Sequence, residues 1–467
     1  MTAPSSQTVR FALCQQAAKG TEAAGSSSYP FIAGIGDQSQ MQPAFDWIEP
    51  KNQHAGLTLR PTARQSRRIA ANYLENVKLK CRLYPDLAGL LLIGSGFADA
   101  PAAVAAASEV WTLSITGTPA GGSFALRFFA SGTPASGWQT TATIPYNPTN
   151  SQIQTALGGL ANIGTGNVAV TGTAPGPFTV TFQGTMANLA GGTLQLAANS
   201  LTGGSAPGVA LTCTTPGSAA YYDHVFTLAD RAAISWLSML WRTADPTAGS
   251  TATFERAATD VRFTKTMLTA DAAGMVLDLT GYGISEAPSL GTETVTAETN
   301  QPFSPYSGSF SALWDGGQLE GLALSHKLTF DQGLYKDEKK LHTWGRADFP
   351  PNGTDISGDL TGVDMVASVY RSINWGSLYG SAPSALIPEA ALDFNWTTEA
   401  NMPGCSVPYK LRVQVPTAQV YLGGNVEANG ANLIRLDSRW EMLDMGGEAT
   451  PPITITLTNL RAAYTGT

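Results

Sequence analysis

The sequence is poor in charged residues. Of its 467 residues only 13% are Asp, Glu, Lys or Arg, which is about half the usual share. Disorder requires low hydrophobicity together with high charge, and the hydrophobic fraction of 43% excludes it. Because surfaces that become buried in an assembly need few solvating charges, this composition favours a β-rich protein that associates with itself.

An excess of basic residues is also lacking. The chain has 27 Lys and Arg against 35 Asp and Glu, so its net charge is −8. A protein that grips nucleic acid statically is normally basic, because neutralisation of phosphates supplies most of the affinity. The balance therefore argues against tight nucleic-acid binding.

Cysteine and histidine are scarce and scattered. The four cysteines, Cys14, Cys81, Cys213 and Cys405, have no CxxC spacing, which disfavours a disulfide scaffold or a zinc site. The four histidines, His54, His224, His326 and His342, form no HExxH motif. The sequence has no GxSxG elbow, Walker A loop or GxGxxG that opens a helix. We therefore expect no catalytic site and no cofactor.

Acidic residues give no clear metal or catalytic motif. Asp337 and Glu338 lie in the charge run KDEKK, which is typical of a solvated hairpin tip. Asp359 and Asp364 could approach a cation, but the spacing of an EF-hand is missing. We expect no metal.

Long hydrophobic runs are missing as well. The longest, Leu87–Ile93, is far shorter than the ~20 residues that span a bilayer. The N-terminal segment MTAPSSQTVRFALCQQ lacks the pattern of a secretory signal. From the sequence we expect a soluble protein made in the cytoplasm, with no membrane partner.

The stretch 109–216 differs from the rest of the chain, because Glu109 and Arg127 are its only charged residues. ADAPAAVAAAS precedes it and TTPGSAA closes it, and both have the composition of linkers. We therefore expect 109–216 to be a separate domain, inserted into a host domain.

Within this insert, periodicity predicts strands and one helix. The strand pattern of alternating apolar residues appears twice, at Phe124, Leu126 and Phe128 and at Phe178, Val180 and Phe182. Helical spacing joins Ile153, Ala156, Leu157 and Leu160, and Thr149 with Gln152 predicts a capping box before them. The insert is predicted to be a small α+β sandwich.

The host segments are predicted to be mainly β. Alternation predicts a strand through Val77, Leu79 and Cys81, and Pro85-Asp86 signals the start of a short helix. Strand character resumes at 225–228, and 261–268 pairs with 275–279 across a turn at 271–274. A similar order recurs later: strand 356–360, a helix-like segment 363–370, then strands through Leu411–Val415 and Ile453–Leu457. This order predicts an internal duplication.

One basic stripe stands out. Arg60, Arg64, Arg67 and Arg68 are spaced so that they would share one face of a helix. A patch that binds nucleic acid would have aromatic residues between the basic ones, and this stripe has none. Two interpretations stay open, a solvated face and a contact with acidic residues of a neighbouring subunit.

Several of these segments resemble the major tail tube proteins of long-tailed (siphovirus-type) bacteriophages. The stretches that carry the resemblance are NVKLKCRLYPDLAGLLLIGSGF, YYDHVFTL, FERAATDVRFTKTMLTADAAGMVLDLTGYG, PPNGTDISGDL and PPITITLTNLRAAYTGT. Together they cover most of 45–104 and 217–467. The insert, through IPYNPTNSQIQTALGGLANIGTGNVAVTG and PFTVTFQG, resembles an accessory domain of phage virion proteins. Most simple tube proteins lack so large an insertion.

The resemblance implies β-sandwich or barrel tube domains, each with a short flanking helix. The expected domains are a discontinuous first one (1–104 and 217–290), the inserted accessory or decoration domain (109–216) and a second, tandem one (291–467). The resemblance further implies that the chain is a structural virion protein and not an enzyme. Such a protein would be located in the phage tail and assembled in the host cytoplasm. Its rings would stack into a tube that conducts DNA at ejection.

The resemblance also implies partners: further copies of the chain, the tape measure, the tail terminator, the tail tip, and double-stranded DNA in transient passage. Two tandem domains predict a trimeric ring with pseudo-sixfold symmetry, and a plain hexamer is the rival. The acidic balance predicts a negative bore.

Two other classes of function stay open. The first is another phage tail, baseplate or decoration protein. The second is a carbohydrate-binding module or glycosidase, and a glycosidase would need two carboxylates about 5–10 Å apart.

Overall fold

The chain folds mainly into β-structure, and the computed structural model divides it into two compact units. The host unit contains residues 1–101, 224–398 and 410–467, and the second unit contains 102–223 and 399–409. The structure describes most residues between 10 and 464. Outside the described residues are 1–9, 21–28, 33–39, 49–67, 131–136, 245–252, 289–294, 321–324, 340–345, most of 365–388, 423–426, 430–432, 444–450, 465–467 and a few isolated positions.

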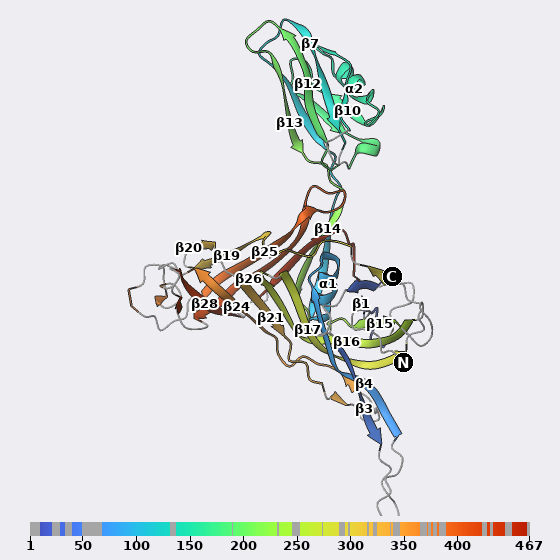
Figure 1. The fold of residues 1–467 in the computed structure, drawn as a ribbon, viewed down its shortest axis with the longest axis vertical. Helices are drawn as coiled ribbons and strands as arrows, with labels where there is room; N and C mark the ends of the chain where they lie inside the picture. The colour runs from blue at the N-terminus through green and yellow to red at the C-terminus, as the bar shows by residue number, and fades with distance from the viewer. Residues whose placement is uncertain are drawn as a thin grey trace, which may run out of the picture. The chain divides into compact units, whose positions relative to one another are not determined.

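Mostly antiparallel strands, several of them long, form the host unit (Figure 1). Before the insert come β1 (Arg10–Gln15), β2 (Tyr29–Ile32), β3 (Gln40–Ile48), β4 (Arg68–Arg82), α1 (Pro85–Gly94) and β5 (Phe97–Val104). After it come β14 (Tyr221–Leu228), β15 (Leu237–Ala244), β16 (Thr253–Asp271), β17 (Gly274–Pro288), β18 (Val295–Ala297), β19 (Gly308–Trp314), β20 (Gly317–Glu320) and β21 (Ser325–Asp331). The last are β22 (Glu338–Lys339), β23 (Arg346–Asp348), β24 (Asp355–Asp364), β25 (Glu389–Asn401), β26 (Pro408–Leu422), β27 (Glu427–Asn429), β28 (Leu433–Met442) and β29 (Thr454–Asn459).

One continuous run of strands organises this unit. In spatial order it is β3, β4, β17, β16, β21, β24, β28, β26 and β29, each antiparallel to the next. The first half of the host meets the second half inside this run, where Lys265–Ala270 of β16 pair with Asp331–His326 of β21. The predicted strand pair 261–268 and 275–279 is confirmed as part of β16 and β17, and Asp271 pairs with Gly274 at the turn.

Helix α1 is confirmed at its predicted start. Pro85 has the backbone φ that the first helical turn requires, and Asp86 lies in that turn, where the helix dipole favours an anion. Most of its residues are buried, so it is a core helix. It contacts β29, β16, β1 and β2.

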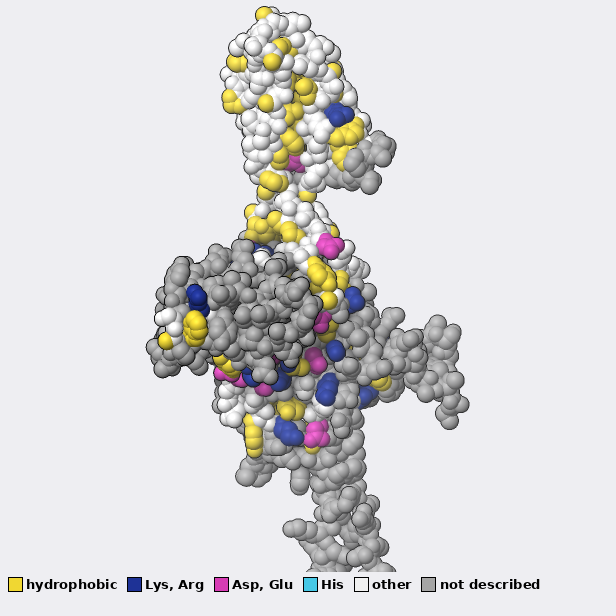
Figure 2. Space-filling view, turned by 60° about the vertical axis from the view of Figure 1, so that its left-hand side comes forward, with side chains coloured by type: hydrophobic (Ala, Val, Ile, Leu, Met, Phe, Trp, Pro, Cys, Tyr) yellow, Lys and Arg dark blue, Asp and Glu magenta, His cyan; other side chains and the backbone are white. Residues whose placement is uncertain are grey.

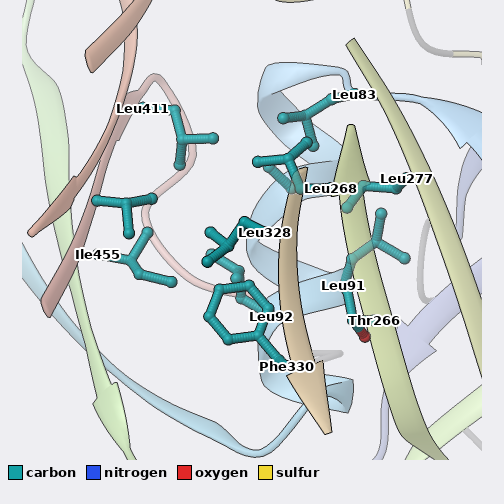
Figure 3. Close-up of a pocket in the computed structure, with 12 residues that line it drawn as sticks. Leu83, Leu91, Leu92, Thr266, Leu268, Leu277, Leu328, Phe330, Leu411 and Ile455 are labelled. Atoms are coloured by element: carbon teal, nitrogen blue, oxygen red, sulfur yellow. The ribbon is translucent and has the colours of Figure 1, made fainter. Parts of the chain in front are cut away.

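The host core lies between α1 and strands β16, β17, β21, β26 and β29. Leu92 of α1 lies beside Leu328 of β21, and Leu411 of β26 and Ile455 of β29 face them from the other side (Figure 3). Leu79, Leu328 and Leu457 are fully buried. Among the residues that line the small void left here, only Thr266 has a polar side chain.

The second unit is a sandwich of two small sheets. One sheet has the order β10 (Val168–Thr171), β11 (Phe178–Phe182), β6 (Val110–Thr116) and β13 (Gly208–Thr215). The other joins β12 (Thr193–Thr202), β7 (Gly121–Phe129) and β8 (Gln139–Thr140), and β9 (Ile144–Pro145) also pairs with β7. A 3-10 turn at Gly184–Met186 follows β11.

Helix α2 (Asn150–Gly158) is confirmed with its capping box. Thr149 Oγ1 accepts from the Gln152 N–H, and the Gln152 side chain accepts from the Thr149 N–H. The helix buries Ile153 and Leu157 in the core of the sandwich, where the Phe128 and Phe182 rings stack 4.8 Å apart. The visible face of this unit carries almost no charge (Figure 2).

One expectation about the joints needs correction. The Ala-rich segment expected as a flexible linker is largely strand, because β5 runs through Val104 and pairs with β14. Small side chains do not prevent a strand when a neighbouring strand supplies its backbone hydrogen bonds. The second unit also includes 399–409, the turn between β25 and β26, through the hydrogen bond from Ala219 N to Gly404 O.

The structure groups 291–398 and 410–467 with the first host segments in one unit. Of the predicted second helix, Val363 and Asp364 lie in β24, and the remainder, 365–370, lies outside the described residues.

Candidate assembly surface

The sheet from β4 to β26 has two different faces. Its inner face is apolar and packs against α1 and the core. On the opposite face, residues in register across the strands form two rows that are mainly polar. One row runs Lys80, Asp278, Met267, Thr329, Ser357, Glu441 and Gln419, and the next runs Arg82, Val276, Thr269, Lys327, Asp359, Arg439 and Tyr421. We call this the polar face.

Positive and negative side chains are interleaved on the polar face. Lys327 pairs in register with Asp359, and Asp359 pairs with Arg439. Arg439 Nε lies 4.0 Å from Asp359 Oδ1 and 3.9 Å from Glu441 Oε1. These three side chains are each nearly half exposed, so each pair contributes only about 0–1 kcal/mol of stability. The polar face is therefore nearly neutral and holds no concentrated charge of either sign.

Tyr421 lies on this face and forms a hydrogen bond there. Its hydroxyl donates to Glu441 Oε1. Desolvation, followed by this carboxylate, raises the pKa of Tyr421 to about 12. The phenol therefore stays neutral throughout the physiological range.

Most of the predicted arginine stripe lies outside the described residues. Arg60, Arg64 and Arg67 lie outside the described residues, and Arg68 is the first residue of β4, in register with Ile48 of β3. A residue in a strand does not continue a helical face, so the helical arrangement does not extend to Arg68. The subunit contact at this stripe stays a prediction.

A buried histidine lies where β5 and β14 run side by side. His224 Nδ1 lies 2.9 Å from Asp99 Oδ2, and Nε2 lies 2.7 Å from Arg461 O. Burial by itself lowers the pKa of His224, but hydrogen bonds to Asp99 and to the Arg461 carbonyl raise it overall. Two acceptors around one ring favour the imidazolium, so this is a structural ion pair.

A second cluster surrounds the buried Arg262 of β16. The Arg262 guanidinium lies 3.5 Å from the centre of the Trp236 ring and donates to Ile234 O. Lys19 approaches the same ring at 4.7 Å, and Asp348 accepts from Arg262 at 3.4 Å. Burial lowers the pKa of Arg262 to about 10, so it remains charged. No sequence pattern indicates this cluster, because its members are far apart along the chain.

The remaining candidates form no reactive site in the described part of the chain. There, Cys14, Cys81 and Cys405 are buried thiols, and Cys213 is exposed on β13. No group of three or more His, Cys, Asp or Glu side chains gathers as metal ligands would among the described residues. His54 and His342 lie outside those residues. Neither α1 nor α2, the α-helices with described bounds, has the length and apolar character needed to cross a membrane.

No protein-family model matches the chain, and no curated protein matches it.

Proposed function

We propose that this protein is a structural subunit of a bacteriophage tail tube, and that its rings stack into a conduit for DNA ejection. The observation that carries the proposal is the two-faced sheet, with α1 and the apolar core on one side and the polar face on the other. A tube wall needs an apolar surface that packs into its core and a polar surface that faces the solvent of the bore. The resemblance of the host segments to tail tube proteins supports the same assignment.

In this proposal the polar face lines the bore. DNA must pass without sticking, and a surface on which opposite charges neutralise one another offers phosphates little attraction. The net charge of −8 favoured a negative bore, whereas the described residues of the polar face mix both signs. The proposed bore is therefore nearly neutral.

The join between β16 and β21 supports a ring of three chains. It connects the first and second parts of the host edge to edge within one sheet. If the second part of one chain met the first part of the next in a similar way, three chains would close a ring with six similar joins. Closed cyclic symmetry is the norm for such subunits, and closure leaves no open strand edges. The insert would project as a decoration domain.

The same proposal assigns the partners and location expected from the sequence. The chain would assemble in the host cytoplasm, contact the tape measure, terminator and tip proteins, and reside in the phage tail. Sedimentation velocity over increasing concentrations of the purified protein, with negative-stain images, tests the proposal. We expect large species that appear as rings or tubes. A single monomeric species at every concentration would contradict it.

A further inference from the structure

The second unit has an open groove between helix α2 and the segment that joins β8 to β9. Its volume is about 440 Å³, within the range of about 300–1,000 Å³ that is typical of small-molecule sites. On the helix side, residues that share one face of α2 line the groove: Ser151, Gln152 and Thr155. Thr140 and Thr143 line the opposite side. The two buried residues of the lining, Ile144 and Leu160, are apolar.

Hydrogen bonds hold both sides of the groove in place. Between β8 and β9, the Thr141 N–H donates to Leu126 O at 2.8 Å, and the Leu126 N–H donates to Thr141 Oγ1 at 3.0 Å. Beyond the end of α2, the Asn162 N–H donates to Gln139 Oε1 of β8 at 3.1 Å. The groove is therefore formed without a ligand, and binding would not incur the cost of ordering its walls.

Several polar groups of the groove are free to bind a ligand. Four exposed hydroxyl groups have no hydrogen-bond partner within the described part of the chain, and they belong to Thr140, Thr143, Ser151 and Thr155. The Gln152 side chain is fixed, because its Oε1 accepts from the Thr149 N–H at 2.8 Å, and its Nε2 is left as a donor. Each hydroxyl both donates and accepts, so the groove offers donors and acceptors on both sides.

The electrostatics of the groove disfavour a charged ligand. None of the described residues that line it is charged, so an ion would lose its hydration without gaining a counter-charge. A helix N-terminus can bind an anion through its unpaired N–H groups, but those of the first turn of α2 are occupied. The Ser151 N–H donates to Asn150 Oδ1, and the Gln152 N–H donates to Thr149 Oγ1.

We propose that this groove binds a neutral carbohydrate, such as a short stretch of a glycan chain. Sugar hydroxyls donate and accept as the Ser and Thr hydroxyls do, and the apolar face of a sugar ring suits the uncharged, partly apolar lining. Tyr146, which directly follows the lining residue Pro145, is 38% exposed and offers an aromatic ring. A peptide would instead pair its backbone with an open strand edge, whereas the free groups here belong to side chains. The inference concerns the second unit alone and does not depend on whether the chain forms a tube.

A microarray of neutral and acidic oligosaccharides, incubated with the fluorescently labelled full-length chain, provides the first test. We expect binding to one or more neutral oligosaccharides. That binding should change less than about twofold between low and high salt, because no charged pair that salt would screen contributes to it. A chain that binds no neutral oligosaccharide, or only acidic ones, would overturn the inference.

Substitutions locate the binding in the groove. Thr143→Val combined with Thr155→Val removes one hydroxyl from each side with little change in shape. This double variant should bind the neutral oligosaccharide at least about tenfold more weakly, as expected for two lost hydrogen bonds. Thr155→Tyr, which fills the groove, should abolish binding. Thr179→Val, at an exposed position of β11 outside the groove, is the matched control and should bind as the wild type does.

Melting temperatures of all variants verify that they are folded. Because Thr143 and Thr155 are exposed, we expect these temperatures to stay close to that of the wild type. Wild-type affinity in both the double variant and Thr155→Tyr would show that the oligosaccharide binds elsewhere on the chain, and would overturn the inference.

Discussion

His224 and Asp99 form an ion pair between β14 and β5, with His224 Nδ1 2.9 Å from Asp99 Oδ2. These are the two strands through which the chain enters and leaves the insert. The His224 side chain is fully buried, and its second nitrogen is held by the carbonyl of Arg461, near the C-terminus. The pair therefore ties three distant segments of the host together.

Asp99→Asn should destabilise the host unit and change its pH profile. Removal of one partner from a buried pair costs about 3–5 kcal/mol. The pKa of His224 is raised above its ordinary value of 6.5, so the pair stabilises the fold fully below that pH. Its contribution is lost as the pH rises through the raised pKa.

Melting temperatures measured across this range should therefore fall with rising pH in the wild type, and less steeply in Asp99→Asn. The exposed carboxylate Asp230 supplies the control, and Asp230→Asn should follow the wild type. Parallel profiles for the wild type and Asp99→Asn would contradict the ion pair.

His326→Phe should stabilise the protein most strongly in acid. His326 stacks on Phe394 with ring centroids 3.9 Å apart, and neither of its nitrogens has a partner within the described structure. Burial lowers its pKa from 6.5 to about 3. The unfolded chain therefore binds a proton that the folded chain does not, and stability is lost as the pH falls from 6.5 toward 3.

Urea unfolding of the wild type and His326→Phe at neutral and acidic pH measures this difference. The variant should gain about 1–3 kcal/mol at neutral pH from loss of the unsatisfied nitrogens, and more in acid. A gain that is the same at both pH values would show that His326 does not titrate as described.

Gly89→Ala should destabilise the protein, although alanine normally favours a helix by about 1 kcal/mol over glycine. A Cβ at Gly89 of α1 would lie 2.1 Å from the Tyr464 ring. Tyr464 is itself buried and held by Asn459, whose Nδ2 lies 2.6 Å from its hydroxyl. Thermal unfolding checks the sign, and Tyr464→Leu in the same chain should relieve part of the loss. A more stable Gly89→Ala single variant would contradict this packing.

Removal of residues 109–216 should leave a chain that still folds and assembles. Ala107 and Ser218 form a two-way backbone bridge, with N···O distances of 2.8 and 2.9 Å. Joining Ser108 directly to Gly217 therefore places a two-residue Ser-Gly turn between paired residues, a common hairpin connection. Sedimentation and electron microscopy of the deletion variant test this. A soluble product that never assembles would mean that the insert belongs to the tube wall.

Local patterns predicted much of the fold. The Pro85-Asp86 start of α1, the capping box at Thr149 and the alternation in β26 and β29 all depend on residues close together in sequence. Such elements can be predicted because periodicity and caps act within a few residues. The β16–β17 hairpin belongs to the same class, since its turn lies between its two strands.

Long-range contacts could not be predicted in this way. His224 and Asp99 lie 125 positions apart, and neither carries a motif that identifies the other. The Ala-rich β5 has the composition of a linker and becomes a strand through its pairing with β14. Gln332 is one glutamine among many until the fold buries it beside Gly96. The ion pair and the burial of Gln332 therefore depend on tertiary structure, which a single sequence does not reveal.

A cryo-electron microscopy reconstruction of the purified, concentrated protein would show whether the chain builds a tube. We expect stacked rings of three chains around an open bore, with Lys327, Asp359 and Arg439 of the polar face turned toward the bore and the insert projecting outward. Six chains per ring would contradict the duplication and leave the tube intact. Particles without a continuous channel, or a channel lined by other surfaces, would contradict the assignment as a tube subunit.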